Sequence, residues 1–162
     1  MRLTHYTDYA LRTLLYLGLH GKELASIGEI ARAYGISENH LTKVVHHLGR
    51  MGVVETLRGR GGGLRLARAP ELIRIGEVVR QTEDDLALVD CFGSVPCAIA
   101  GACGLQRLLG EALAAFLAVL DRATLADLLR PEGRATAARL GLPGWEAGTA
   151  AGAQSQMGGL PG

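Results

Sequence analysis

The amino-acid sequence predicts a mainly α-helical fold that carries one small β-hairpin and a long C-terminal helix. Three patterns indicate this fold: two short amphipathic helices joined by a tight turn at Gly35, a glycine-rich connection over residues 58–63, and heptad-spaced apolar residues from Leu105 onward. A chain of 162 residues is long enough for one domain with an appended element.

Capping signals in residues 1–52 predict three consecutive helices. Each candidate N-cap is followed, at helical distance, by a glycine that can end the helix. The caps are Thr4 or Thr7, Ser26 and Ser37, and the stops are Gly21, Gly35 and Gly52. Ser26 is also followed by Glu29, which is the sequence of a capping box. The second and third helices therefore have the organisation of a helix-turn-helix.

Two short apolar segments, residues 53–57 and 64–67, come directly after the third helix. Their connection is Arg58-Gly59-Arg60-Gly61-Gly62-Gly63, which is typical of a hairpin with a flexible tip. A helix-turn-helix followed at once by a hairpin is a winged helix-turn-helix, which we assign to residues 1–70.

The second half of the chain divides into three expected parts. Residues 71–103 form a connecting helix (73–81) and an irregular cysteine loop, residues 104–131 form one long helix, and residues 132–162 form a disordered tail rich in glycine and alanine. The long helix has a heptad seam, which consists of Leu105, Leu109, Ala112, Phe116, Val119 and Ala123. A second apolar stripe on another face consists of Leu108, Leu113, Leu117 and Leu120. A helix that is apolar on two faces needs two partners, so we expect a homodimer; the alternative is burial within its own core.

The net charge of +1 conceals an uneven distribution. Residues 1–68 hold ten Lys or Arg against five Asp or Glu, a charge of +5, which leaves −4 for residues 69–162. A basic first half favours a polyanionic partner, although an ordinary solvated surface would look the same. No stretch is long and apolar enough for a membrane span or a signal peptide, so we expect a cytoplasmic protein.

The first half of the chain contains side chains suited to reading double-stranded DNA. The start of the second helix of a helix-turn-helix meets base edges in the major groove, and arginines at a wing tip can enter a narrow minor groove. The candidates are Ser37, Asn39, His40, Thr42, Lys43 and Arg50 on the helix, and Arg58 and Arg60 on the wing. No nucleotide-binding glycine motif or nucleophile–base pair indicates an enzyme; an adaptor that binds protein rather than DNA is the other alternative.

The three cysteines, Cys91, Cys97 and Cys103, lie within thirteen residues, which suggests one shared ligand. Cysteine thiolates on irregular backbone are typical of iron–sulfur clusters, and the spacing is wider than the pairs of structural zinc sites. Zinc with one further ligand, or unligated thiols acting as a redox switch, remain alternatives. Asp8 is a candidate fourth ligand, although it can equally serve to favour a helix N-terminus.

Several segments together resemble the winged-helix iron–sulfur regulators. They are Met1-Arg2-Leu3-Thr4 with Tyr9-Ala10, the Arg58-Gly59-x-Gly61-Gly62-Gly63 wing, Ile75-Gly76-Glu77-Val78 and the three cysteines. The resemblance covers roughly residues 1–130 and implies a dimeric transcription repressor. In one branch of the family, regulators of cluster assembly, a histidine three residues after the last cysteine completes a [2Fe–2S] site, but this chain has Gln106 there.

The branch that senses nitric oxide is more similar. The matching segments are Thr7-Asp8-Tyr9, Leu88-Val89-x-Cys91 and Thr124-Leu125-Ala126-Asp127-Leu128. This resemblance implies a [4Fe–4S] cluster held by the three cysteines and Asp8. It also implies that cluster nitrosylation releases operator DNA and so controls genes for nitrosative stress.

Overall fold

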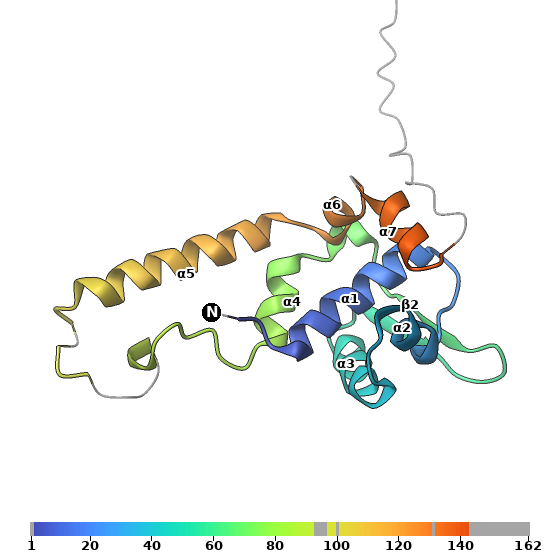
Figure 1. Ribbon diagram of the computed structural model, residues 1–162, viewed down its shortest axis with the longest axis horizontal. Helices are drawn as coiled ribbons and strands as arrows, with labels where there is room; N and C mark the ends of the chain where they lie inside the picture. The colour runs from blue at the N-terminus through green and yellow to red at the C-terminus, as the bar shows by residue number, and fades with distance from the viewer. Residues whose placement is uncertain (1, 93–96, 100, 131, 143–162) are drawn as a thin grey trace, which may run out of the picture.

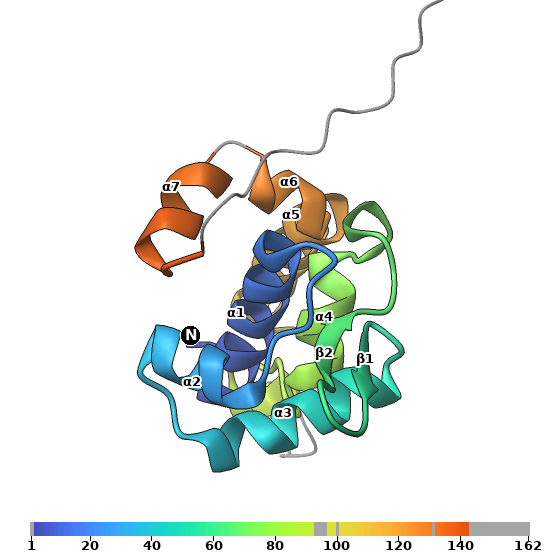
Figure 2. The same cartoon turned by 90° about the vertical axis from the view of Figure 1, so that its right-hand side faces the viewer.

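Helix α1 (His5–His20) lies at the centre of the computed structural model, which describes residues 2–92, 97–99, 101–130 and 132–142. Ala10, Leu14 and Leu17 bury their side chains almost completely on its inner faces. Figure 2 shows the other helices of the DNA-binding half and of the C-terminal region around α1. Contacts join α1 to α3, α4, α6, α7 and β2, whose bounds are given below.

The helix-turn-helix consists of α2 (Ile27–Tyr34) and α3 (Glu38–Arg50). The Thr4 hydroxyl caps α1 by accepting a bond from the Thr7 N–H, and Ser26 and Glu29 form both bonds of a capping box before α2. Gly35 ends α2 in the left-handed conformation, with φ 65° and ψ 36°, which glycine adopts without steric penalty. The predicted N-caps of α1 and α2 and the predicted end of α2 are confirmed. They could be predicted because each depends on capping bonds within one turn of the chain.

The wing is an antiparallel pair, β1 (Val54–Leu57) and β2 (Gly63–Leu66), in which Val54 faces Leu66 and Leu57 faces Gly63. Ala25, just before α2, extends the sheet by one bridge, since its N–H and C=O both bond to Leu64. The hairpin projects from the body of the molecule (Figure 1). The chain is therefore a mainly α-helical winged helix with a small two-stranded sheet, as the sequence predicts.

The C-terminal half contains α4 (Ile75–Thr82), preceded by the 3-10 turn η1 (Pro70–Leu72) and followed by η2 (Asp90–Phe92). The long helix α5 (Gly104–Arg122) comes next, and then the short helices α6 (Leu125–Leu129) and α7 (Gly133–Arg139). Within the described residues, no helix has the length and apolar character needed to cross a bilayer.

The prediction of one continuous helix over residues 104–131 is wrong. Ala123 takes an extended conformation after α5, and Thr124 forms a capping box with Asp127 that begins α6. Ala123 and Leu125 also exchange backbone bonds with the segment before α4: Ile75 N–H bonds to Ala123 O and Leu125 N–H bonds to Ile73 O. This tertiary pairing interrupts an otherwise helical pattern.

The faces of α5 also differ from the predicted seam. Leu109, Leu113, Phe116 and Leu120 are half-buried on one side, whereas Leu105, Leu108, Ala112, Ala115 and Val119 are exposed on the other. Each set has its own spacing of three and four residues, and the predicted seam mixes members of both. Among the residues of α5, all of which the structure describes, none is fully buried.

The expectation that residues 132–162 form a disordered tail is wrong for its first part. Helix α7 packs against α1, and Ala137 and Leu142 are buried in the main core. The side chains of α7 that face α1 are small, and the same alanines contribute to the composition on which the expectation of disorder was based. The rest of the expected tail, from residue 143, lies outside the described residues.

The two N-caps of the helix-turn-helix differ in a way that stability measurements can detect. Ser37 precedes α3 but makes no side-chain cap bond to the described residues, unlike Ser26. We expect Ser26→Ala to lower the free energy of unfolding by about 1 kcal/mol, because an N–H of α2 loses its acceptor. Ser37→Ala serves as the matched control with a smaller loss. Chemical denaturation of both variants tests this, and equal losses would contradict it.

Candidate functional site

The outer face of α3 presents the predicted DNA-reading side chains to solvent. Leu41, Val44, Val45 and Leu48 are buried on the inner face, which fixes the rotation of the helix. All six candidates on or just before α3 are exposed: Ser37, Asn39, His40, Thr42, Lys43 and Arg50. The Thr42 hydroxyl donates to Glu38 O at 2.8 Å, so only its lone pairs remain for a ligand.

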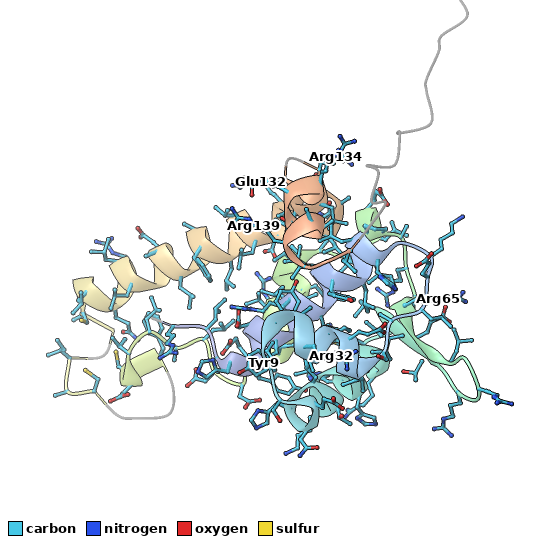
Figure 3. All side chains as sticks on the ribbon, turned by 45° about the vertical axis from the view of Figure 1, so that its right-hand side comes forward. Tyr9, Arg32, Arg65, Glu132, Arg134 and Arg139 are labelled. Atoms are coloured by element: carbon cyan, nitrogen blue, oxygen red, sulfur yellow. The ribbon has the colours of Figure 1, made fainter. Side chains whose placement is uncertain are left out.

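Aromatic side chains of α1 support the start and the middle of α3. The rings of Tyr9 and His40 stack with centroids 6.4 Å apart, and Figure 3 shows Tyr9 near the start of α1. The Tyr6 hydroxyl lies 3.3 Å from Lys43 O and 3.1 Å from His47 Nδ1. Burial raises the pKa of Tyr6, which keeps its hydroxyl protonated and able to donate. The sequence analysis missed these partners, because nothing in the spacing of α1 shows which helix its tyrosines meet.

The wing tip carries Arg58 and Arg60, both exposed, and Arg60 lies between two glycines with positive φ, Gly59 at 104° and Gly61 at 81°. A Cβ on Gly62 would lie 2.2 Å from Leu57 O, so only glycine fits this turn. Below the tip, Arg65 of β2 pairs with Glu55 of β1 across the strands. Figure 3 shows the labelled Arg65 on the wing. The tip therefore keeps two cations in solution on a narrow backbone.

The three cysteines border the loop at the far end of α5. Cys91 lies in η2 and Cys103 is the N-cap of α5; all three thiols are half-buried and free of disulfides. Gln106 joins the two ends of the loop: its backbone N–H bonds to Cys103 Sγ at 3.4 Å, and its side-chain amide donates to Cys91 O at 3.2 Å. Gln106 thus has a structural role in the loop that its position in the sequence did not reveal. Residues 93–96 and 100 lie outside the described part.

These cysteines fit an iron–sulfur cluster by their chemistry. Three cysteines on irregular backbone, partly accessible and unpaired with one another in the described part of the chain, are the residue type that holds such clusters. However, the described residues contain no group of three or more His, Cys, Asp or Glu close enough to hold a metal ion. The thiols therefore have to converge before they can bind a cluster together.

Asp8, the candidate fourth ligand, is not brought to the cysteines of its own chain. It lies in the first turn of α1, whereas the cysteine loop lies at the end of α5 that projects away from the body (Figure 1). Its carboxylate pairs with Arg12, whose Nε lies 2.9 Å from the carboxylate oxygens. The Arg12 guanidinium also lies over the Tyr34 ring, 5.6 Å from the centroid, and so connects α1 to the end of α2.

Comparison with known proteins gives a consistent result. Residues 3–131 match the Rrf2 family, described as iron-dependent transcriptional regulators. The HTH-type transcriptional regulator NsrR of Bacillus subtilis (strain 168) is 55% identical over 133 residues, which cover 80% of this chain and 91% of that protein. Among solved structures, CymR, the global cysteine regulator of B. subtilis, has a TM-score of 0.67 at 27% identity, covering 79% of this chain and 95% of CymR. IscR of T. potens has a TM-score of 0.67 at 26% identity, covering 83% of this chain and 90% of IscR.

The contact between Arg12 and Tyr34 can be followed by titration. Burial raises the pKa of Tyr34 to about 12, although the nearby Arg12 acts to lower it. Because the folded pKa lies above the unfolded value of about 10, the neutral phenol stabilises the fold fully below that value and the stabilisation is lost as the pH rises toward 12. We expect ultraviolet titration to show that the last phenolate to form is absent in Tyr34→Phe. Titration of all tyrosines in one step near pH 10 would contradict this.

Proposed function

The chain belongs to the Rrf2 family of transcriptional regulators, and on this premise we propose that it is a homodimeric, cytoplasmic repressor that senses nitric oxide. In this proposal it binds operator DNA with its cluster intact and controls genes for nitrosative stress. One observation carries the proposal: α5 has thiols at its first end, and its last end is bonded to the segment at the start of α4, which packs against α1 of the winged helix. A chemical event at the loop can therefore act on the DNA-reading half through one rigid element.

DNA is the partner of the winged helix. As a member of this family, the chain is a DNA-binding transcriptional regulator and not an enzyme. We assign base contacts to Asn39 and His40, and phosphate or base contacts to Ser37, Thr42 and Lys43. Arg50 would lie near the DNA backbone, with Arg58 and Arg60 in the minor groove.

The homodimer is supported by the exposed stripe on α5. Leu105, Leu108 and Val119 are 61%, 60% and 56% exposed, on a helix that projects into solvent. Their heptad spacing, completed by Ala112 and Ala115, is that of a helix packed on a second helix. Exposed apolar stripes of this kind mark protein interfaces. A second copy of α5 would cover the stripe.

The cluster ligands in this proposal are Cys91, Cys97, Cys103 and Asp8, the set of a [4Fe–4S] site. Asp8 lies apart from the cysteine loop of its own chain (Figure 1), so we assign it to the loop of the partner protomer. Arg12 has to release the carboxylate before Asp8 can bind iron, since the two are paired. When bound, the cluster supplies an iron site with one oxygen ligand that nitric oxide can attack more easily than an all-thiolate site.

The metal content and its response to nitric oxide test this proposal. The full chain, purified without air, is expected to contain about four irons and four sulfides per chain. Stepwise addition of nitric oxide should bleach the cluster absorbance and release a duplex that the wild-type chain has selected from a random pool. Asp8→Ala should weaken that release, because the winged helix is then no longer held by the cluster.

Other outcomes would replace the proposal. About two irons per chain, with DNA binding insensitive to nitric oxide, would indicate a [2Fe–2S] regulator of the IscR type. Zinc or no metal would indicate a thiol-responsive winged-helix regulator. If Asp8→Ala keeps its cluster and releases DNA as the wild type does, the link through Asp8 is wrong.

The wing arginines provide a separate test of DNA binding. Arg58→Ala and Arg60→Ala should each weaken binding to the selected duplex by roughly tenfold. Each should also reduce the salt dependence of binding, because fewer counterions are released. Arg65→Ala is the matched control, since it removes the same charge from the same hairpin at a residue already paired with Glu55. An equal effect of all three changes would indicate only a loss of net charge.

A further inference from the structure

The last turn of α5 is joined to α4 by a two-pronged ion pair. Both terminal guanidinium nitrogens of Arg80 donate to the Asp121 carboxylate, with Nη2 2.7 Å from Oδ2 and Nη1 in contact with Oδ1. Arg74, the N-cap of α4, donates from Nη1 to the Asp121 backbone oxygen at 3.1 Å. This fork geometry fixes orientation as well as distance, because planar guanidinium and carboxylate groups align.

Gly76 lets the two helices approach until their backbones nearly touch. A Cβ at this position would lie 2.0 Å from Asp121 Oδ1 and 2.8 Å from the Asp121 backbone nitrogen. Gly76 belongs to the Ile75-Gly76-Glu77-Val78 segment, to which the function proposed above assigns no role. The close approach supplies a physical reason for glycine there.

Backbone bonds complete the joint on its other side. Arg74 and Thr124 form an antiparallel bridge, with Ile75 N–H bonded to Ala123 O at 3.0 Å and Leu125 N–H bonded to Ile73 O at 2.8 Å. The chain is thus held both before α4 and directly after α5. Figure 1 shows the opposite end of α5 reaching away from the body.

We propose that Asp121 is a positioning residue for DNA recognition, which sets the angle between the dimerisation helix α5 and the winged helix and thereby the separation of the two recognition helices. This inference rests on the proposed dimer through α5. A 19-residue helix is about 28 Å long, so a tilt of about 10° at the joint displaces its far end by about 5 Å. Half-sites about 34–36 Å apart do not tolerate such a shift in each subunit.

The charges at the joint agree with this role. The hydrogen bonds from Arg80 lower the pKa of Asp121, so the carboxylate is ionised at neutral pH. Both side chains of the pair are more than a third exposed, and exposed ion pairs contribute little to the stability of a fold. The neutral variant Asp121→Asn should therefore fold and dimerise. A change in its DNA binding would then report the angle of α5 and not a loss of folded protein.

The test compares spacing preference. A single half-site is first selected from random duplexes by the wild-type chain, and inverted repeats of it are then built with spacers that vary by one base pair. The wild type should prefer one spacer. Asp121→Asn and Arg80→Gln should each lose about 2- to 30-fold in affinity for that spacer, and bind the neighbouring spacers almost equally well. The double variant should be no worse than either single one.

One control variant and three control measurements make the outcome decisive. Glu77→Gln removes a charge from α4 at a residue that, among those described, does not bond to α5, and it should keep the wild-type spacer preference. If Glu77→Gln broadens the spacer preference as much as Asp121→Asn does, the loss of charge and not the joint explains the effect. Half-site affinity, melting temperature and dimer mass of Asp121→Asn should match the wild type. An unchanged spacer preference in Asp121→Asn would overturn the inference. A wild type that shows no preference among spacers would instead refute the proposed dimeric DNA binding.

Discussion

The burial of α1 is the constraint on which the rest of the molecule depends. Ala10, Leu14 and Leu17 have almost no exposure, and α3, α4, α6 and α7 all pack against the same helix. The recognition helix α3 and the helix α4, which contacts α5, are therefore both attached to α1. A core packed this tightly transmits displacement instead of absorbing it. Asp8 lies in the first turn of the same helix.

Local chemistry made much of the fold predictable. The caps at Thr4 and Ser26 and the left-handed Gly35 depend on residues within one turn of chain, so their sequence signatures sufficed. The end of α5 at Arg122 could not be predicted in this way, because the break depends on pairing with a segment about fifty positions earlier in the chain. Helix α7 was not predicted because its buried residues are glycine and alanine, which give no periodic pattern of large apolar side chains.

The candidate site was predictable to the extent that it is local. The buried stripe of α3 fixes which of its polar residues face solvent, and the glycines of the wing predict its tip. The candidate metal ligands were different, since the cysteines share one loop while Asp8 is paired with Arg12 on another element. No spacing rule shows which residues of different elements come together. The sequence analysis considered Gln106 only at the position of a metal ligand, whereas in the structure its bonds to Cys91 and Cys103 hold the two ends of the loop together.

The wing tip combines glycines that the backbone requires with two arginines that it does not. Gly62 has Leu57 O where any side chain would begin, whereas Arg58 and Arg60 extend into solvent from the same short turn. Over evolutionary time, mutation can exchange the two arginines without disturbing the hairpin, but the glycine between them and β2 has to stay. The charge that the wing presents to solvent can therefore change while the backbone of the hairpin stays the same.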